Sequence, residues 1–495
     1  MRCSAPRLLI AATASGAGKT TVVCGLLRAL QRRGVRVQAC KCGPDYIDPQ
    51  FHREVIGVPS RNLDLFLAGE DVVRELVAQG AKESDLTLIE GAMGYYDGIA
   101  QSSDSSSFDL ARATQTPAVL VVDARGRALS AAAEVAGFLH FREPSHIAGI
   151  ILNRVSASYF AQLKAMIERE AHVPVLGYVP WVDVAELECR HLGLVGAHEV
   201  ADLAAKVDAL ADELEKTVDL DVLLAVAQHA EPLSFEPRAL PAPCEAQPVV
   251  AVARDEAFSF YYEDSLALLE RLGAHIAYFS PLHDDALPPR VCGLYLGGGY
   301  PELHAEALSR NASMLVQVRE AVSSGMPTIA ECGGFLYLHQ ILEDTEGRAW
   351  PMVGAVSGRV YPLGRLARFG YVTLTAQEDG LLASAGQRVR AHEFHYWESS
   401  EPGAGFRAQK PQSGREWDCV ISTPTLYAGF PHLYLGGCSR AAKRFVDACA
   451  AYDATRGTGA GHDARVAYGA TRGTGAADGA TRGACATDGA ARGAC

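Results

Sequence analysis

A glycine-rich loop near the N-terminus has the composition of a phosphate-binding site. The segment LLIAATASGAGKTT at 8–21 joins an apolar run to a helical pattern. Gly16 and Gly18 let backbone N–H groups surround an anion, and the start of the helix adds its positive dipole end. Lys19 can neutralise β- and γ-phosphate charge, and the Thr20 hydroxyl can bind Mg²⁺. The first glycine of the strict pattern is a threonine here, but the loop still predicts nucleotide binding rather than a plain glycine turn.

Carboxylates follow the next two predicted strands. KCGPDYIDP comes after the second strand and EGAMGYYDG after the third. Magnesium bound to ATP takes one or two carboxylates, and open α/β sheets place their sites where parallel strands end. Asp45, Asp48 and Asp97 are also ordinary turn formers beside proline or glycine. Glu90 differs because it closes an apolar strand, where an unpaired carboxylate is costly, so the segments predict a nucleotide and metal site.

A cysteine in the second half lies between a predicted strand and a predicted helix, in PTIAECGGFL. A nucleophile on such a sharp turn is expected to be exposed, and the helix start is expected to lower the pKa of its thiol. Gly333, and Gly298 in the loop LGGGYPE, can supply N–H donors to an oxyanion. A solitary cysteine is usually a buried apolar residue, but this setting predicts that Cys332 is a nucleophile.

A cysteine nucleophile needs a base, and two histidines are candidates. His432 lies in YAGFPHLY near the end of the second half, and His395 lies in HEFHY. The base must take the thiol proton and return it to the leaving group. The residues alone leave both open as the base, and His395 could instead be part of a substrate wall.

Alternating strands and helices must position these residues. In the first half, apolar runs predict strands at 8–12, 35–40, 86–90, 118–123 and 147–153, with helices at 20–33 and 130–141. In the second half, strands are predicted at 249–253, 275–279, 293–296 and 327–330, with helices at 265–272 and 314–323. This alternation predicts an α/β protein with parallel sheets covered by helices.

Composition divides the chain into segments. The proline-rich stretch EPLSFEPRALPAPCEAQP begins at 231 and cannot form a continuous helix or a central strand. We therefore expect a first domain over 1–230, a linker over 231–247 and a second domain over 248–450. Imperfect ATRGTGA-like repeats predict a low-complexity, disordered tail over 451–495.

Charge and hydropathy exclude several classes of protein. The net charge is −13, with no basic block, which argues against a nucleic-acid partner. No apolar stretch approaches the roughly 20 residues that span a bilayer. The thirteen cysteines are an odd number without framework spacing and fit reduced thiols in the cytoplasm.

Segments of the first half resemble the ATP-dependent synthetase domain of the cobyrinic acid a,c-diamide synthase family. That domain is P-loop NTPase-like and belongs with dethiobiotin synthetase and the partitioning ATPases. The matching segments, in family order, are ATASGAGKTT, KCGPDYIDP, NLDLF, EGAMGYYDG, VVDARG and ILNRV. Partitioning ATPases usually carry a second lysine where this chain has Ala14, so the synthetase branch is favoured.

The resemblance implies a role for each residue of the site. The residues that would bind the nucleotide are Ser15, Gly16, Gly18, Lys19, Thr20 and Thr21. The residues that would hold Mg²⁺ are Thr20, Asp45 and Glu90. On the substrate side, Asp48 and Asp97 would face a tetrapyrrole, and Tyr46 would line the same wall. Asn153 would contact the adenine edge, with a strand-terminal turn residue as the alternative.

Segments of the second half resemble the class I (triad) glutamine amidotransferase domain, in the variant fused to corrin amide synthases. They are ARDEAFSFYY, LYLGGGYPE and AECGGFLYL. The resemblance implies that Cys332 attacks the glutamine amide, forms a thioester and releases ammonia, with Gly298 and Gly333 at the oxyanion. It also favours His432 over His395 as the base, because the family's histidine sits at the end of the domain. General amidotransferases carry a glutamate where this chain has Tyr434, so the third member of the triad is unidentified.

Together the resemblances imply amidation of the a and c carboxylates of cobyrinate or hydrogenobyrinate in cobalamin biosynthesis. ATP, glutamine and the corrin would be the substrates, with Mg²⁺ as cofactor, and a homodimer is left open. One alternative keeps the chemistry but changes the substrate, as a nickel-tetrapyrrole a,c-diamide synthase or a cobyric acid synthase. The other is a partitioning-type switch ATPase with an inactive second domain.

Overall fold

A parallel sheet forms the centre of the N-terminal α/β unit. The computed structural model describes residues 1–181 and 197–457, and there the sheet has seven strands in the order β4-β3-β5-β2-β6-β7-β8. Every neighbouring pair is parallel. The strands are β2 (Arg7–Ala12), β3 (Val37–Cys42), β4 (Ser60–Leu63), β5 (Leu86–Glu90), β6 (Ala118–Asp123), β7 (Ile147–Asn153) and β8 (Val175–Val179).

Helices cover both faces of this sheet, because its strands are apolar on both sides. Along β2, Leu8 and Ile10 belong to one core, and Leu9 and Ala11 to the other. The first core is covered by α1 (Lys19–Arg32), α7 (Ala197–Thr217) and α8 (Leu220–Gln228). The second is covered by α3 (Glu70–Gly80), α4 (Ser107–Thr114), α5 (Leu129–His140) and α6 (Ala157–Ala171). The short helices α2 (Ile47–Phe51) and η1 (His52–Ile56) follow β3.

The second α/β unit is centred on another mostly parallel sheet, in the order β11-β10-β12-β13-β23-β22. Its strands are β10 (Val249–Ala253), β11 (His275–Phe279), β12 (Val291–Leu296), β13 (Thr328–Glu331), β22 (Ile421–Ser422) and β23 (Leu426–Gly429). Only the β22–β23 pair among them is antiparallel. Its helices are α9 (Glu263–Arg271), η4 (Pro301–Leu303), α10 (Ala305–Arg310), α11 (Ala312–Ser323), α12 (Gly333–Leu338), η5 (Leu435–Gly437) and α13 (Ser439–Gly457).

Smaller sheets complete the molecule. One has the order β21-β20-β17-β18-β24, a second β15-β14-β16-β19, and a third pairs β1 with β9. Their strands are β1 (Arg2–Cys3), β9 (Leu233–Ser234), β14 (His339–Glu343), β15 (Ala349–Pro351), β16 (Val356–Pro362), β17 (Arg368–Ala376), β18 (Arg388–His395), β19 (Trp397–Ser399), β20 (Phe406–Gln409), β21 (Glu416–Cys419) and β24 (His432–Leu433).

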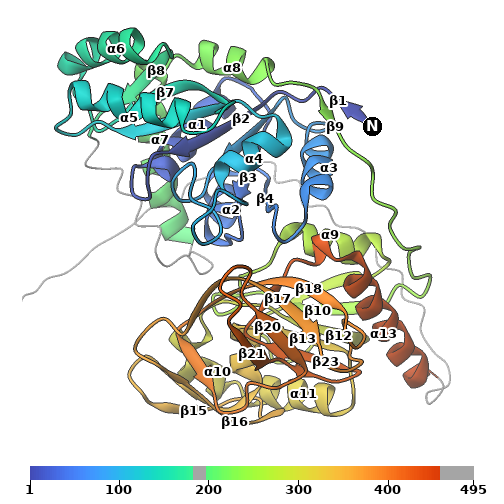
Figure 1. Ribbon diagram of the computed structural model, residues 1–495. Coiled ribbons are helices and arrows are strands. Elements are labelled where there is room, and N and C mark those ends of the chain that lie inside the picture. The colour runs from blue at the N-terminus through green and yellow to red at the C-terminus, as the bar shows by residue number, and fades with distance from the viewer. Residues whose placement is uncertain (182–196, 458–495) are drawn as a thin grey trace, which may run out of the picture.

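The two units lie one above the other in Figure 1, and the segment after α8 runs down one edge between them. Polar contacts join them directly. The Tyr371 hydroxyl donates to Asp64 Oδ2 at 2.7 Å. Arg61 and Asp264 form an ion pair, with 3.6 Å between the guanidinium nitrogen and Asp264 Oδ1. The carboxyl edge of the first sheet therefore faces the second unit. In the part of the chain that the structure describes, no helix combines the length and the apolar character of a membrane span.

The predicted element boundaries are confirmed at several strands and corrected at two places. Strands β5, β6, β7, β10 and β11 have the predicted bounds. β3 is predicted at 35–40 but spans Val37–Cys42, so it begins and ends two residues later; the polar Lys41 is buried by ion pairs and continues the strand. The tail was expected to begin at 451, yet α13 continues to Gly457, and its Tyr452 hydroxyl lies 2.8 Å from Ser324 Oγ. The remainder of the predicted tail, 458–495, lies outside the described residues.

Candidate functional site

The phosphate loop connects β2 to α1 and is closed by the end of β7. Gly18 precedes the first residue of α1 with a φ of 93°, and Gly16 has a φ of 78°. Glycine accepts these left-handed conformations without steric cost. Asn153 Nδ2 donates to the Ala17 carbonyl at 2.8 Å, and a Cβ on Gly18 would lie 2.1 Å from Nδ2. Asn153 therefore holds the loop through its backbone, and contact with adenine stays a prediction.

The first turn of α1 contacts the third predicted strand. Lys19 Nζ donates to the Met93 carbonyl at 2.9 Å, and the Thr20 hydroxyl donates to Glu90 Oε1 at 2.6 Å. Burial and the nearby Lys41 ammonium lower the pKa of Lys19 below its ordinary value. The loop thus brings a cation and a hydroxyl to the same strand end as a carboxylate.

Lys41 stands at the centre of the carboxylates that the sequence singled out. The register of β3 and β5 places Lys41 directly opposite Glu90. Its Nζ lies 2.9 Å from Glu90 Oε1 and 3.8 Å from Asp45 Oδ2, and it also donates to Asp48. Lys41 is 5% exposed and Glu90 is fully buried. A buried cation therefore balances three acidic groups at the carboxyl edge of the sheet.

The protonation of this cluster follows from burial and pairing. Burial alone would raise the pKa of Glu90, but Lys41, His52 and Thr20 together hold it below its ordinary value. Burial and the neighbouring Glu90 raise the pKa of Asp48. Glu90 Oε2 lies 3.4 Å from His52 Nε2 and has no hydrogen-bond partner within the described residues. One buried carboxylate oxygen is thus left available to a ligand.

The other residues predicted for this site lie at its rim. Asp97 Oδ2 accepts from the Gly94 N–H at 2.9 Å and shapes a turn, while its side chain is exposed. Ser15 is exposed in the loop, and Thr21 is partly buried in α1. Asp45 Oδ1 accepts from the N–H groups of Ile47 and Asp48, which fixes the start of α2.

The turn at Cys332 has the strained geometry of a nucleophile between a strand and a helix. Cys332 follows β13, precedes α12 and has φ 47° and ψ −101°. Its N–H donates to the Gly429 carbonyl at 2.8 Å. A Cβ on Gly333 would lie 3.0 Å from the Gly299 N–H nitrogen, so only glycine lets the loop 297–299 approach so closely. The predicted oxyanion glycines therefore lie side by side.

The expected exposure and low pKa of Cys332 are wrong. The side chain is only 7% exposed, and burial, with Glu302 next in effect, raises the pKa of the thiol to about 12. The Gly333 N–H at the helix start acts in the predicted direction but is outweighed. Helix α12 has only six residues, and burial removes the solvent that would stabilise a thiolate.

His432 lies against the glycine loop next to this turn. A Cβ on Gly298 would be 2.5 Å from His432 Cε1. His432 Nδ1 is 4.0 Å from an oxygen of Glu331, the residue before Cys332. His395 is also close, but its Nδ1 contacts the Trp397 carbonyl at 2.7 Å and its ring stacks on Phe430. The geometry favours His432 as the base, and the choice stays a prediction.

Tyr46 connects the two clusters. It follows Asp45 in the first unit, and its ring stacks on Phe260 with centroids 5.1 Å apart. The same ring lies 4.5 Å from Tyr262 and 5.3 Å from His432, centroid to centroid. The loop that carries the predicted magnesium carboxylate therefore also touches the histidine of the cysteine site.

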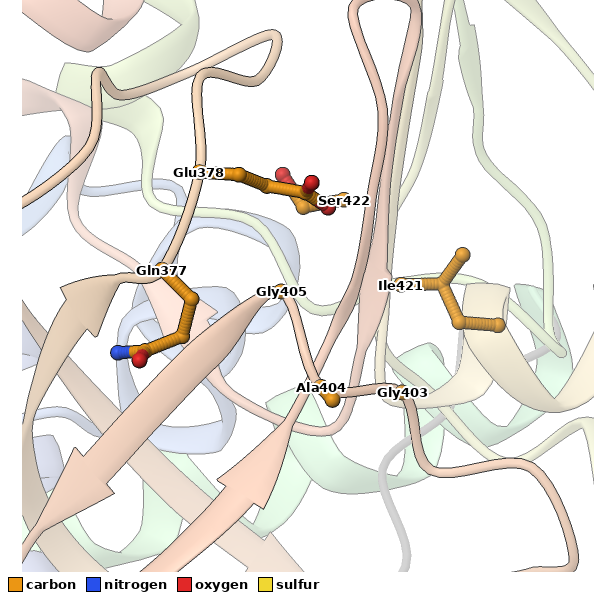
Figure 2. Close-up of a pocket in the computed structure, with 7 residues that line it drawn as sticks. All are labelled: Gln377, Glu378, Gly403, Ala404, Gly405, Ile421 and Ser422. Atoms are coloured by element: carbon orange, nitrogen blue, oxygen red, sulfur yellow. The ribbon is translucent and has the colours of Figure 1, made fainter.

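A pocket of about 390 Å³ lies away from both clusters. Figure 2 shows Gln377 and Glu378 on the loop after β17, facing the segment before β20 and strand β22. Its lining residues are Gln377, Glu378, Gly403, Ala404, Gly405, Ile421 and Ser422. None of the predicted site residues is among them.

Comparison with known proteins agrees with this geometry. Residues 8–195 match the CobQ/CobB/MinD/ParA nucleotide binding domain, and residues 249–436 match the CobB/CobQ-like glutamine amidotransferase domain. The cobyrinate a,c-diamide synthase of Caldanaerobacter subterraneus subsp. tengcongensis is 40% identical over 450 residues, which cover 90% of this chain and 98% of that protein. The chain belongs to the cobyrinate a,c-diamide synthase family.

Other cobyrinate a,c-diamide synthases are similarly close. That of Salmonella typhimurium is 42% identical over 433 residues, covering 86% of this chain and 94% of that protein. That of Priestia megaterium is 37% identical over 449 residues, covering 90% and 97%. The family assignment therefore spans both halves of the molecule.

Sequence reasoning missed two charged residues of this family member. Lys41 stands inside KCGPDYIDP, and a lysine within an apolar strand beside acidic segments was a usable signal. Glu331 precedes Cys332 and, like Glu90, is a carboxylate at the end of an apolar strand, which was also a usable signal. The partners of Lys41 and Glu331 could not be predicted, because each contact joins strands that are distant in sequence.

Proposed function

We propose that this protein uses ATP and glutamine to amidate the a and c side-chain carboxylates of cobyrinate or hydrogenobyrinate in cobalamin biosynthesis. The observation that carries the proposal is the contact of Tyr46 with His432, which joins the carboxylate segment beside the phosphate loop to the histidine beside the Cys332 turn. Family membership supports the chemistry of both halves. We take residues 1–230 as the synthetase domain and 248–450 as the amidotransferase domain.

The synthetase half would convert a carboxylate into an acyl phosphate. A carboxylate is a poor electrophile at neutral pH, and phosphorylation gives it a leaving group. Lys19 and the N–H groups of the loop would stabilise the charge of the transferring phosphoryl group. Asn153 would keep those N–H groups in place by binding the Ala17 carbonyl.

The donor set at the strand ends fits a magnesium ion. A hydroxyl and carboxylates are the oxygen ligands that Mg²⁺ prefers, and Glu90 Oε2 is buried without a hydrogen-bond partner in the described chain. Thr20, Asp45 and Glu90 would hold the ion, which neutralises phosphate charge when bound. Lys41 would keep Glu90 ionised and would hold Asp48 in line with it. Asp48, Asp97 and Tyr46 would line the tetrapyrrole side.

The amidotransferase half would supply ammonia. His432 would take the Cys332 proton as sulfur attacks the glutamine carbonyl, and would return it to the departing nitrogen. Gly298 and Gly333 would donate N–H groups to the oxyanion. Water would then release glutamate from the thioester, and ammonia would attack the acyl phosphate.

The corrin and the assembly state remain parts of the proposal. A nickel-tetrapyrrole a,c-diamide synthase or a cobyric acid synthase would use the same site chemistry, but the relatives reported above are cobyrinate a,c-diamide synthases. A switch ATPase would leave the Cys332 turn without a use. A cytoplasmic enzyme, and a homodimer, are compatible with the proposal and are tested by fractionation and light scattering.

Product analysis tests the proposal. Purified enzyme with ATP, Mg²⁺ and glutamine is given cobyrinate, hydrogenobyrinate or a nickel tetrapyrrole in separate reactions. We expect a mass change of two carboxyl-to-amide conversions with a corrin that carries free a and c carboxylates. ATP hydrolysis that is independent of glutamine and corrin, without any amide product, would support the switch ATPase instead.

A further inference from the structure

Glu331, the residue before Cys332, has a buried carboxylate to which the proposed function assigns no role. Glu331 ends β13, and its side chain is only 2% exposed. Its Oε1 accepts from the Leu433 N–H at 2.9 Å, and its Oε2 accepts from the Tyr295 hydroxyl at 3.1 Å. Oε2 also lies 4.0 Å from His432 Nδ1. The carboxylate is therefore held between β12 and β24, facing the histidine.

We infer that Glu331 is the positioning residue that orients His432 for proton transfer with Cys332. The inference rests on the proposed glutamine-dependent function and names the third member of that site. Glu331 acts through His432 in two ways. It fixes the backbone of β24 at the neighbouring Leu433, and it faces the ring nitrogen on the side of β13.

The surroundings of His432 show why a carboxylate is needed. Burial, together with the smaller effects of His392 and His395 on β18, lowers the pKa of His432 to about 3. Tyr46 covers the ring from the first unit and is uncharged. A proton taken from Cys332 would therefore be poorly tolerated unless an anion faces the ring. Glu331 is the carboxylate that the structure places there.

The carboxylate is itself sensitive to a charge on the histidine. Burial raises the pKa of Glu331 to about 8, while the Leu433 N–H and the Tyr295 hydroxyl oppose this effect. An imidazolium at 4.0 Å favours the ionised carboxylate, and the carboxylate favours the imidazolium. A move of about 1 Å would turn this distance into a hydrogen bond, and catalytic hydrogen bonds are often longer before substrate binds.

Glu331→Gln separates positioning from simple packing. Glutamine has the same size and keeps an oxygen for the Leu433 N–H, but it has no charge. Two rates are measured in the same preparation, one with glutamine and one with ammonium chloride as the nitrogen source. Their ratio does not depend on the fraction of folded enzyme, because both rates scale with it.

We expect the glutamine-driven kcat to fall about 100-fold in Glu331→Gln, within the range for general acid–base groups. The KM for glutamine and the ammonia-driven rate should stay within about threefold of wild type, since no substrate contact is lost. Glu331→Asp keeps the charge at shorter reach and should recover part of the rate. Tyr295→Phe, which removes a contact to Glu331 but not its charge, is the matched control and should change the rate by less than about threefold.

Alkylation of Cys332 by iodoacetamide gives a second readout that needs no corrin. In the wild type, the Glu331-supported thiolate–imidazolium pair should extend alkylation to lower pH than in Glu331→Gln. Equal ratios of the two nitrogen sources and equal alkylation profiles in both proteins would overturn the inference. If the wild type hydrolyses glutamine but amidates no corrin, the proposed function fails, while the comparison of glutaminase rates still decides the role of Glu331.

Discussion

The phosphate loop and the Cys332 turn both occupy the junction of a parallel strand and a helix, yet they differ in exposure and in how their ionisable groups are balanced. At the phosphate loop, Ser15 and Gly16 are exposed, and the acidic groups behind them are already balanced by Lys41. At the cysteine turn, the thiol is buried and its pKa is raised to about 12. The nucleotide site is therefore prepared for its ligand, whereas the thiol depends on neighbouring groups to become reactive.

The contact at Tyr46 gives this difference a physical basis. Tyr46 stands between Asp45, which is predicted to hold magnesium, and His432 of the cysteine site. A ligand that moves the loop after β3 would move this ring as well. We therefore expect ligand binding at the exposed phosphate-loop site to control the reactivity of the buried Cys332 site.

Replacing the nucleophile should have the largest effect. Cys332→Ala removes the only group proposed to attack glutamine, so the glutamine-driven rate should fall at least about 1000-fold. The ammonia-driven rate should remain near wild type, because the phosphate loop is untouched. Amide product is quantified by mass spectrometry with each nitrogen source. Glutamine-driven amidation that persists in Cys332→Ala would remove the cysteine site from the account.

Removing the buried ammonium group of Lys41 should strongly lower the free energy of unfolding. Lys41→Met leaves the buried Glu90 and Asp48 without their counter-ion, which costs about 3 to 5 kcal/mol of unfolding free energy when a buried pair is broken. Chemical denaturation measures the change. Arg36→Met is the matched control, since the Arg36–Asp85 pair is exposed and screened by solvent, so its loss should change stability little. Similar losses in both variants would show that burial of Lys41 does not matter.

Removing the contact between Tyr46 and His432 should make Cys332 more accessible. Tyr46→Ala removes the ring that covers His432, so iodoacetamide should alkylate Cys332 about tenfold faster without ATP or corrin, as expected for a local opening of about 1.4 kcal/mol. Glutamine hydrolysis per amide formed should rise at the same time. Tyr159→Ala, on α6 of the first unit, is the control. Unchanged alkylation in Tyr46→Ala would break the link between the two sites.

Loosening the phosphate loop should have the smallest effect. Asn153→Ala removes one hydrogen bond to the Ala17 carbonyl, and such a bond contributes about 1 kcal/mol. We expect the KM for ATP to rise roughly fivefold, with the KM for glutamine unchanged. Steady-state kinetics with each substrate varied in turn measures both. A change confined to glutamine would contradict the assigned position of Asn153.

Much of the fold could be predicted from local patterns. Strands β5, β6 and β7 have the expected bounds because each is a continuous apolar run bounded by polar residues. β3 was predicted two residues too early because its end includes Lys41, and a buried lysine is recognisable only once Glu90 is placed beside it. Helix α13 extends past the expected boundary because a formed helix adds residues at little cost.

The sites show a similar division. The phosphate loop and the Cys332 turn were located from glycine spacing, since close backbone approaches require it. The burial of Cys332 was missed because it depends on the packing of segments that are distant in sequence, such as the one at Gly429, rather than on its own segment. Glu331 was missed for the same reason, as its partners Tyr295 and Leu433 come from separate strands.

Transfer of nitrogen from glutamine to the corrin is the most direct test of the central claim that the two sites work as one enzyme. The enzyme is given ATP, cobyrinate and glutamine labelled at its amide nitrogen, together with unlabelled ammonium at the concentration of the glutamine. The account predicts that both new amides carry the label, because ammonia released at Cys332 reaches the acyl phosphate within the molecule. Amides that carry only unlabelled nitrogen would contradict it.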